Sequence, residues 1–411
     1  MITERSKALI LLTGYLPKAD TKTKPLSTAE YSRLAGWLHQ REFLPEDLTG
    51  PDQATILNNW DDYKIPKERV KGLLSRGATM AICLDKWQRA GVWVVNRSEP
   101  DYPSHYKKVL AHMAPPIFYG VGSKRLLGTD AIGVVGSRNI SEDELSYAYA
   151  LGQRIADASY SVISGGAKGV DEQAMLGALE SEGTCVGILA DQLLKRSTSK
   201  IYRSHIMEKN LALISACHPE ARFHVGNAMA RNKYIYIKSK ATFVVHSGIK
   251  GGTWTGAVEN MKYNWVPIYV KENSESNSGN RALIKNGARV LNSLVNKVSF
   301  DFGDLSKTNV PAQSDLFSKV TEKEPQYNIK HIVGTENKTK APSVTVNKAS
   351  GNPFVLRLIE MLKQDFSDWF TNKEVAKQYE VLPSQMKRWM RRLVELNEIE
   401  EDGNDKFRVL K

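Results

Sequence analysis

Three glycine-bearing loops, each with a basic residue, are the first feature of this sequence that could do chemistry. They read "GSR" at 136–138, "SGGAKG" at 164–169 and "GIKGGT" at 248–253, and each directly follows an apolar run. Glycine lets backbone N–H groups approach an anion closely, while Arg138, Lys168 and Lys250 add positive charge. One such loop is more often a tight turn, but three together predict a phosphate site. The candidate residues are Gly136, Ser137, Arg138, Ser164, Gly165, Gly166, Lys168, Gly169, Lys250, Gly251, Gly252 and Thr253.

The elements around these loops predict how they are positioned. Apolar runs rich in β-branched residues recur between Asp130 and Ser299, separated by segments of helical length. This alternation is typical of a parallel sheet with right-handed crossovers, in which the carboxyl ends of all strands share one edge. We expect a Rossmann-like α/β domain over residues 126–300, with the loops on that edge. A basic cluster of Arg231, Lys233, Lys238 and Lys240 precedes the third loop.

The motifs of several enzyme classes are missing. No stretch supplies a P-loop, and the first loop lacks the Gly-x-Gly-x-x-Gly fingerprint of dinucleotide-binding proteins. His-Glu-x-x-His, paired Cys-x-x-Cys and Gly-x-Ser-x-Gly are also missing, so zinc and esterase chemistry have no motif. We expect no cofactor, no metal and no catalytic residue.

The flanking regions predict two further domains. Helical periodicity over residues 1–125 indicates a helical N-terminal domain with an adaptor, and the polar composition of 301–350 is typical of a linker. Residues 351–411 read as a winged helix-turn-helix, with a capping box from Thr371 to Glu374 and a hairpin turning at Gly403 and Asn404. Its second helix places Trp389, Met390 and Leu393 toward a core. Its basic residues, which either meet DNA phosphates or form a solvated face, are Lys387, Arg388, Arg391 and Arg392.

Charge and cysteine content indicate the kind of partner and the cellular compartment. The formal net charge is +12 and the pI is about 9.3, which favours polyanionic partners. Cys83, Cys185 and Cys217 lie far apart in apolar stretches and are expected to be buried free thiols. No apolar segment reaches membrane-spanning length, so we expect a cytoplasmic protein without a membrane partner.

Several motifs in order resemble the DNA-processing protein A (DprA/Smf) family. They are "GVVGSR", "SGGAKGVDEQAMLGAL", "MARNKYIYIKSKATFVVHS" and "GNRALIKNGARVL", and the similarity covers roughly residues 85 to 295. The resemblance implies a Rossmann-like protein that binds single-stranded DNA and hands it to a RecA-type recombinase in transformation, repair or defence against mobile DNA. It also implies a homodimer formed through the central domain and a non-enzymatic role.

The resemblance assigns roles to individual residues. Arg138, Lys168, Arg231 and Lys233 would contact phosphate, and Ser137 and Asn232 would donate hydrogen bonds. Asp171 would orient its loop. Tyr234 and Tyr236 would either stack on bases or be buried. Where much of the family has Arg-Asn-Arg, this chain has Lys233, which keeps the charge but loses a bidentate fork.

The third loop supports an alternative of another class. The stretch "GGTWTGAVE" is similar to the Gly-Gly-x-Gly-Thr-x-x-Glu motif of phosphoribohydrolases that cleave nucleoside monophosphates. In that case Glu259 would stabilise an oxocarbenium-like centre while Arg138 or Lys250 holds the phosphate. A non-catalytic nucleotide sensor is a further possibility.

Overall fold

The computed structural model describes most of the chain up to residue 298 and scattered residues beyond it. The described residues are 2–16, 23–272, 278–291, the backbone of 293, 294, 297 and 298, and then 362–363, 370–371, 374–375, 378, 390, 393–394, 399–402 and 406–409. By contacts the chain divides into two units, residues 1–308 and 309–411. The linker predicted over 301–350 lies outside the described residues.

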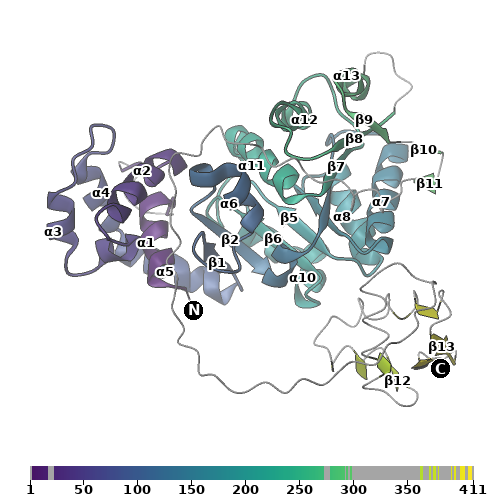
Figure 1. The fold of residues 1–411 in the computed structure, drawn as a ribbon, viewed down its shortest axis with the longest axis horizontal. Coiled ribbons are helices and arrows are strands. Elements are labelled where there is room, and N and C mark those ends of the chain that lie inside the picture. The colour runs from purple at the N-terminus through teal and green to yellow at the C-terminus, as the bar shows by residue number, and fades with distance from the viewer. Residues whose placement is uncertain are drawn as a thin grey trace, which may run out of the picture. The chain divides into compact units, whose positions relative to one another are not determined.

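A nine-stranded, mostly parallel sheet forms the centre of the first unit (Figure 1). The strand order is β1-β2-β6-β5-β4-β3-β7-β8-β9. Strands β3 to β9 all run parallel to one another. Strand β2 pairs antiparallel with β6, and β1 pairs antiparallel with β2. The Rossmann-like α/β fold predicted from the sequence is therefore confirmed. The strands are β1 (Trp93–Asn96), β2 (Ile117–Gly122), β3 (Ala131–Val135), β4 (Ser161–Ser164), β5 (Cys185–Ile188), β6 (Leu211–Ser215), β7 (Ala241–Val244), β8 (Ile268–Lys271) and β9 (Arg289–Leu291).

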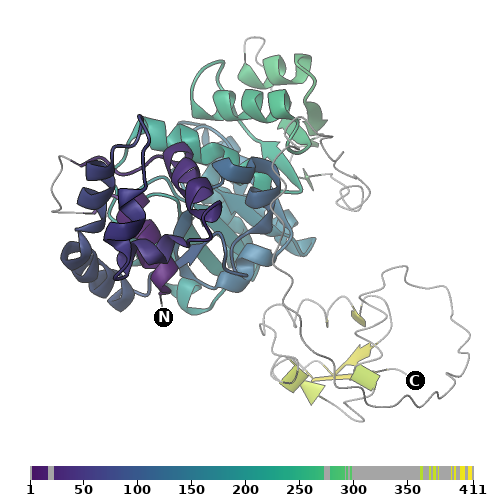
Figure 2. The same cartoon turned by 60° about the vertical axis from the view of Figure 1, so that its left-hand side comes forward.

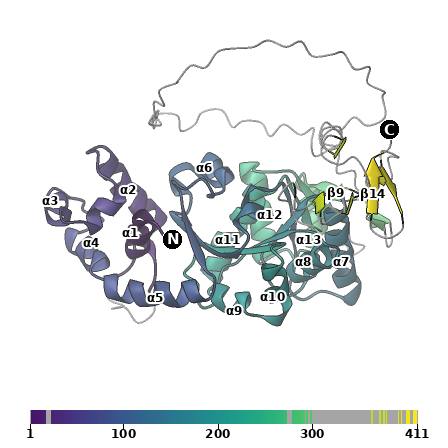
Figure 3. The same cartoon turned by 90° about the horizontal axis from the view of Figure 1, so that it is seen from below.

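Helices cover both faces of this sheet because alternate strand residues point to opposite sides. In β3, Ile132 and Val134 join one core cluster, whereas Ala131 and Val135 join the other. Figure 3 shows α7, α8, α9 and α10 on one side and α6 on the other. The first group is α7 (Glu142–Asp157), α8 (Val170–Glu180), α9 (Leu193–Ser197) and α10 (Lys200–Met207); the second cluster includes residues of α6 (Ser104–Leu110), α11 (Val225–Lys238), α12 (Gly252–Tyr263) and α13 (Gly279–Lys285).

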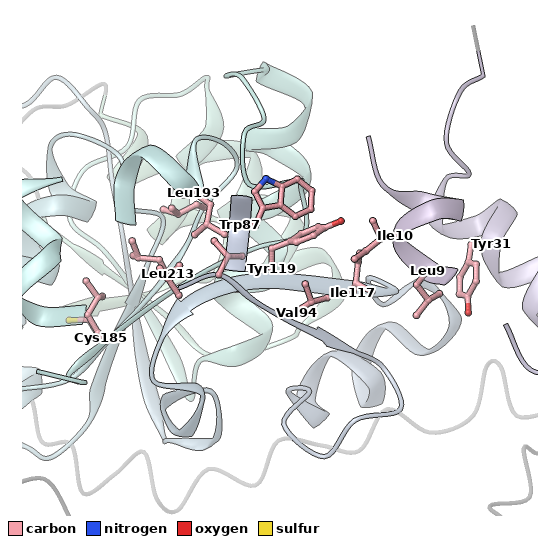
Figure 4. Close-up of a cluster of buried hydrophobic side chains, with 14 of the residues drawn as sticks. Leu9, Ile10, Tyr31, Trp87, Val94, Ile117, Tyr119, Cys185, Leu193 and Leu213 are labelled. Atoms are coloured by element: carbon pink, nitrogen blue, oxygen red, sulfur yellow. The ribbon is translucent and has the colours of Figure 1, made fainter. Parts of the chain in front are cut away.

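The N-terminal helices gather at the end of the sheet formed by β1 and β2 (Figures 1 and 2). They are α1 (Glu4–Thr13), α2 (Thr28–His39), α3 (Gln53–Asn58), α4 (Lys67–Leu74) and α5 (Gly77–Arg89). Ser27 and Glu30 form a capping box that begins α2. The apolar residues of α1 are buried in the core cluster that also lines one face of the sheet, and Figure 4 shows Ile10 near Tyr119 of β2. The Trp87 ring of α5 meets Tyr119 edge-on, with centroids 5.4 Å apart.

Short 3-10 helices complete the connections of the first unit. They are η1 (Pro45–Thr49), η2 (Ala111–Met113) and η3 (Lys124–Gly128), and a two-stranded ribbon of β10 (Ser293–Leu294) and β11 (Lys297–Val298) follows the large sheet. Cys83, Cys185 and Cys217 are free; the first two are buried and the third is half-buried. Among the described residues, no helix is long and apolar enough to cross a membrane.

The described part of the second unit contains a small antiparallel sheet. Its strands β12 (Phe370–Thr371), β13 (Ile399–Glu401) and β14 (Lys406–Val409) are ordered β12-β14-β13. Met390 and Leu393 are buried beside this sheet as predicted, and the capping box between Thr371 and Glu374 is confirmed. Strands β13 and β14 pair as the expected hairpin, whose predicted turn at 403–404 lies outside the described residues. So do Trp389 and the four basic residues Lys387, Arg388, Arg391 and Arg392, and the winged helix remains a prediction.

Candidate phosphate-binding site

The order of the strands places a crevice between β3 and β7. From β3 the chain winds through β4 and β5 to β6, and then returns to the other side of β3 to form β7 and β8. Ligands of open α/β sheets bind at such a reversal, outside the carboxyl ends of the two strands. The first glycine loop follows β3 and the third follows β7, so both loops flank this crevice.

Two cavities open at this edge and share a wall. The larger cavity, of about 660 Å³, is lined by Gly136, Ser137, Arg138, Arg231, Asn232, Lys250, Gly251, Gly252 and Thr253, with neighbours from α8 and α11. The smaller cavity, of about 250 Å³, is lined by Gly165, Gly166 and Lys168 of the second loop and by residues after β5. Arg138 and Arg231 line both cavities, together with Ala167, Phe223 and Ala228. The three loops predicted from the sequence thus meet around two arginines.

Arg231 of α11 is the central cation of this wall. Its side chain reaches across to the second loop so closely that a Cβ built on Gly165 would lie 1.8 Å from Nη1. The residue is only 9% exposed, and its Nε has no hydrogen-bond partner among the described residues. Burial lowers the pKa of this guanidinium, whereas the charge of Asp171 raises it. A buried guanidinium with an unused N–H is costly unless an anion completes it.

The buried carboxylate of Asp171 interacts with the first two loops from inside the protein. It is buried at the start of α8, and backbone N–H groups of Gly136, Gly165 and Ala167 hydrogen-bond to its carboxylate. Burial raises the pKa of Asp171, while Arg231 and these N–H groups oppose that shift. The N–H groups of Gly136 and Gly165 therefore have a partner inside the protein. Asp171 has the geometry of a residue that orients the loops, as the resemblance implied.

The first and second loops also touch directly. Gly169, with φ of +95°, begins α8, and a Cβ there would lie 2.6 Å from the carbonyl oxygen of Ser137 and 2.8 Å from that of Arg138. This backbone contact requires glycine, because an L side chain would meet both strain and a clash. The loop conformation at Arg138 thus depends on the absence of a side chain at residue 169.

The first and third loops are tied by His246. Its backbone oxygen accepts the Ser137 N–H at 3.0 Å, and its ring nitrogen Nδ1 lies 2.8 Å from Oε1 of Glu144 in α7. The N-terminus of α7 is already capped by Ser141 and carries three acids in its first turn. Helix α12 begins at Gly252, and no side chain caps its N-terminus. Of these two helices, α12 offers its N-terminus to an anion.

Three predicted site residues line neither cavity. Ser164 is buried, and its hydroxyl donates to the carbonyl of Val134 at 2.5 Å. Gly169 acts through the backbone contact described above. Lys233 lies two residues from Arg231 on α11 and places its ammonium over the ring of Tyr234, 5.4 Å from the centroid. Residues two apart on a helix do not share a face, so Arg231 and Lys233 point to different surroundings.

Tyr234 and Tyr236 are too deeply buried for bases to stack on them, although Tyr236 is among the residues that line the larger cavity. Tyr234 is 8% exposed and packs edge-on against Tyr106, and Tyr236 is 1% exposed. Neither ring is available as an exposed platform for bases. Glu259, in the second turn of α12, is not among the residues lining either cavity.

The residues of the smaller cavity that the sequence did not predict include four with polar or aromatic side chains: Asp191, Gln192, Arg196 and Phe223. The ring of Phe223 lies under the guanidinium of Arg138, 5.1 Å from the centroid. The signal was present, since Asp191 and Gln192 directly follow the apolar run "CVGILA" and so belong to the same sheet edge. Neither residue lies in a glycine-bearing loop, and only such loops predict the site.

The fold and site define a Rossmann-like protein with glycine loops and arginines at its topological switch point. A family described as DNA recombination-mediator protein A matches residues 93–300, just over half of the chain. The chain therefore belongs to this family, which confirms the resemblance seen in its motifs.

Individual relatives support this membership. A putative DNA processing protein DprA of Mycobacterium tuberculosis is 26% identical over 183 residues, covering 43% of this chain and 47% of that protein. Protein Smf of Synechocystis is 24% identical over 221 residues, covering 51% and 54%. The chain thus spans about half the length of these curated relatives. The solved structure of DNA processing protein A from Streptococcus pneumoniae shares the fold, with a TM-score of 0.55 at 18% identity, over 73% of this chain and 99% of that one.

Proposed function

We propose that this protein binds single-stranded DNA along the carboxyl edge of its central sheet, with a backbone phosphate held between Arg138 and Arg231. The observation that carries the proposal is the buried Arg231, whose Nε has no partner among the described residues at the wall between the two cavities. A phosphate is the ligand that best completes a guanidinium, since it accepts two parallel N–H bonds.

The surroundings of Arg231 favour a strand over an isolated phosphate. Lys168 and Lys250 are exposed on the second and third loops, at the smaller and larger cavity respectively. Exposed apolar side chains at the larger cavity, Phe223, Val225 and Met229, give bases a surface to cover. Cations along a groove with apolar neighbours are typical of single-strand binding without sequence preference.

A salt titration tests this function. Binding of labelled single-stranded and duplex oligonucleotides is measured by fluorescence anisotropy for the wild type and for the Arg138→Ala/Lys168→Ala variant. We expect preference for the single strand and a steep loss of affinity with salt, whose log–log slope falls by about 1.4 in the variant if each residue contacts one phosphate. Single-strand affinity that is unchanged in the variant would contradict the proposed site.

The family membership suggests further steps that rest on this binding. We propose that the protein acts in DNA processing or recombination, presents the bound strand to a RecA-type recombinase, and dimerises through the central domain. A winged helix at residues 351–411 would be auxiliary to the central site. A cytoplasmic location also stays a prediction. Co-sedimentation of a RecA-type recombinase with the strand-bound protein, and its loss when binding is lost, would test the hand-off.

A further inference from the structure

The third loop is held at its start by a buried asparagine of α13. Asn280 is 0% exposed, and its Oδ1 accepts the backbone N–H of Ser247 at 2.7 Å. Its Nδ2 donates to the backbone oxygens of Val245, at 2.9 Å, and of Lys271, at 2.7 Å. Val245 directly follows β7 and Lys271 ends β8. One side chain therefore joins the carboxyl ends of both strands at the point where the third loop leaves the sheet.

The residue before Asn280 restrains the same stretch of backbone. A Cβ built on Gly279 would lie 2.4 Å from the backbone oxygen of Ser247 and 2.3 Å from that of Gly248. Such a close approach between two backbones is possible only for glycine, and any side chain at residue 279 would displace the loop. The first turn of α13 thus fixes the start of the third loop through two consecutive residues.

The other end of the third loop is also anchored. The side-chain amide of Asn232, in α11, donates to the backbone oxygen of Gly252 at 3.0 Å. Between the two anchors, Lys250 and Gly251 are exposed and line the larger cavity. Asn280 itself lines neither cavity. Its effect on a ligand would therefore pass through the loop that it holds.

A loop that is ordered before binding strengthens binding, because its conformational freedom is not lost when the ligand arrives. At the larger cavity an anion would meet the ammonium of Lys250 and the uncapped N-terminus of α12. Both depend on where the third loop lies, since Lys250 belongs to the loop and α12 begins at its end.

We propose that Asn280 is a positioning residue for the single strand. It touches no DNA, and it presets the third loop so that Lys250 and the start of α12 contact one phosphate of the backbone. The inference rests on the proposed function and adds a dependence to it: the phosphate contact of Lys250 exists only while Asn280 holds the loop.

A double-mutant cycle between Asn280→Ala and Lys250→Ala tests this dependence by salt titration of a labelled single-stranded oligonucleotide. Lys250→Ala alone should lower the log–log salt slope by about 0.7, the value of one phosphate contact. Asn280→Ala alone should lower the slope by the same amount and the affinity by about tenfold. The double variant should match Asn280→Ala, because the contact of Lys250 has already been lost.

Asn260→Ala is a matched control at the opposite end of α12. Asn260 is 1% exposed; its Oδ1 accepts the Val266 N–H at 3.2 Å, and its Nδ2 donates to the Val266 backbone oxygen at 2.9 Å. The control should lose stability, as Asn280→Ala does, and keep the wild-type slope and the full effect of Lys250→Ala. Asn280→Ser retains one hydroxyl for the loop, so it should fall between the wild type and Asn280→Ala. It replaces the alanine variant in the cycle if that variant does not fold.

Three results would overturn the inference and leave the proposed function standing. The first is an equal effect of Lys250→Ala on the slope in the Asn280→Ala background and in the wild type. The second is a wild-type slope that Lys250→Ala does not change. The third is rapid hydrogen exchange of the Ser247 amide in the strand-free wild type, since the loop would then not be ordered in advance. A wild type that binds no single strand would remove both proposals.

Discussion

Two buried cations on one helix have opposite surroundings. Arg231, in the middle of α11, is 9% exposed and its Nε has no partner among the described residues, whereas Lys238, at the end of α11, is 3% exposed and donates to the carbonyl of Thr129 at 2.6 Å. Arg231 lies at the carboxyl edge of the sheet beside the cavities; Lys238 lies next to the start of β3 at the amino edge. Burial alone therefore does not mark a binding residue. A buried cation whose donors are used supports the fold, and one with an unused donor points to a ligand.

The largest effect is expected at Arg231. Arg231→Ala should lower single-strand affinity by about 100-fold, because it removes a desolvated charge-assisted contact. Arg231→Lys should fall between, since it keeps the charge without the bidentate fork. Fluorescence anisotropy at one fixed salt concentration measures both, with unfolding curves to confirm that the variants fold. An affinity loss no greater than that of Lys238→Met would remove the contrast between the two buried cations.

The next largest effect on single-strand affinity is expected at Gly169, where the first and second loops touch. Gly169→Ala should lower single-strand affinity by about tenfold and the free energy of unfolding by about 2 kcal/mol, because the new Cβ strains φ and meets the carbonyl oxygens of Ser137 and Arg138. Gly287→Ala is a matched control: its φ is +105°, but the nearest atom to a new Cβ is the end of Met261 at 4.0 Å. The control should lose stability and keep its affinity. Equal loss of affinity in both variants would show that strain, not loop contact, is responsible.

Lys238 should affect how the stability of the fold depends on pH and should not affect DNA binding. Burial lowers its pKa from 10.5 to about 8. Between these values the unfolded chain holds a proton that the folded chain has released, so stability rises with pH, by at most about 1.4 kcal/mol per pH unit from this group. Denaturant unfolding across this window should show a wild-type stability that gains on Lys238→Met as pH increases. A constant difference between the two proteins would mean that Lys238 is not perturbed in the fold.

The smallest effect is expected at Lys233. Lys233→Ala should change single-strand affinity by no more than about twofold and leave the salt slope nearly unaltered, because the ammonium lies over Tyr234 and lines neither cavity. The same salt titration that tests the Arg138→Ala/Lys168→Ala variant checks this. A slope reduced by about 0.7 would instead assign a phosphate contact to Lys233.

Much of the central fold could be predicted because each strand is a short apolar run bounded by polar residues and glycine. The runs at β3 to β8 and the loops after β3, β4 and β7 all lie where the sequence placed them. The antiparallel addition of β2 and β1 could not be predicted, since a short strand carries no sign of which sheet edge it joins. Strand order follows from long-range packing that local patterns do not encode.

The site was predicted as a set of loops but not as two cavities. Helical spacing does not reveal that Arg231 is buried at the two cavities while the half-buried Lys233 lines neither, because that depends on how α11 packs on the sheet. Likewise, the "SGG" motif suggested free N–H donors, yet the N–H of Gly165 is bound by the buried carboxylate of Asp171. Asp191 was not predicted because the loop after β5 carries no glycine.

The continuity between the N-terminal helices and the large sheet has a thermal consequence. One hydrophobic cluster runs from Leu9 of α1 through Trp87 and Tyr119 to Val134 of β3. Helices that share their core with a sheet lose their own packing when the sheet opens, and the sheet loses an apolar cover when they detach. The helices and the sheet should therefore absorb heat in a single calorimetric transition instead of melting in turn.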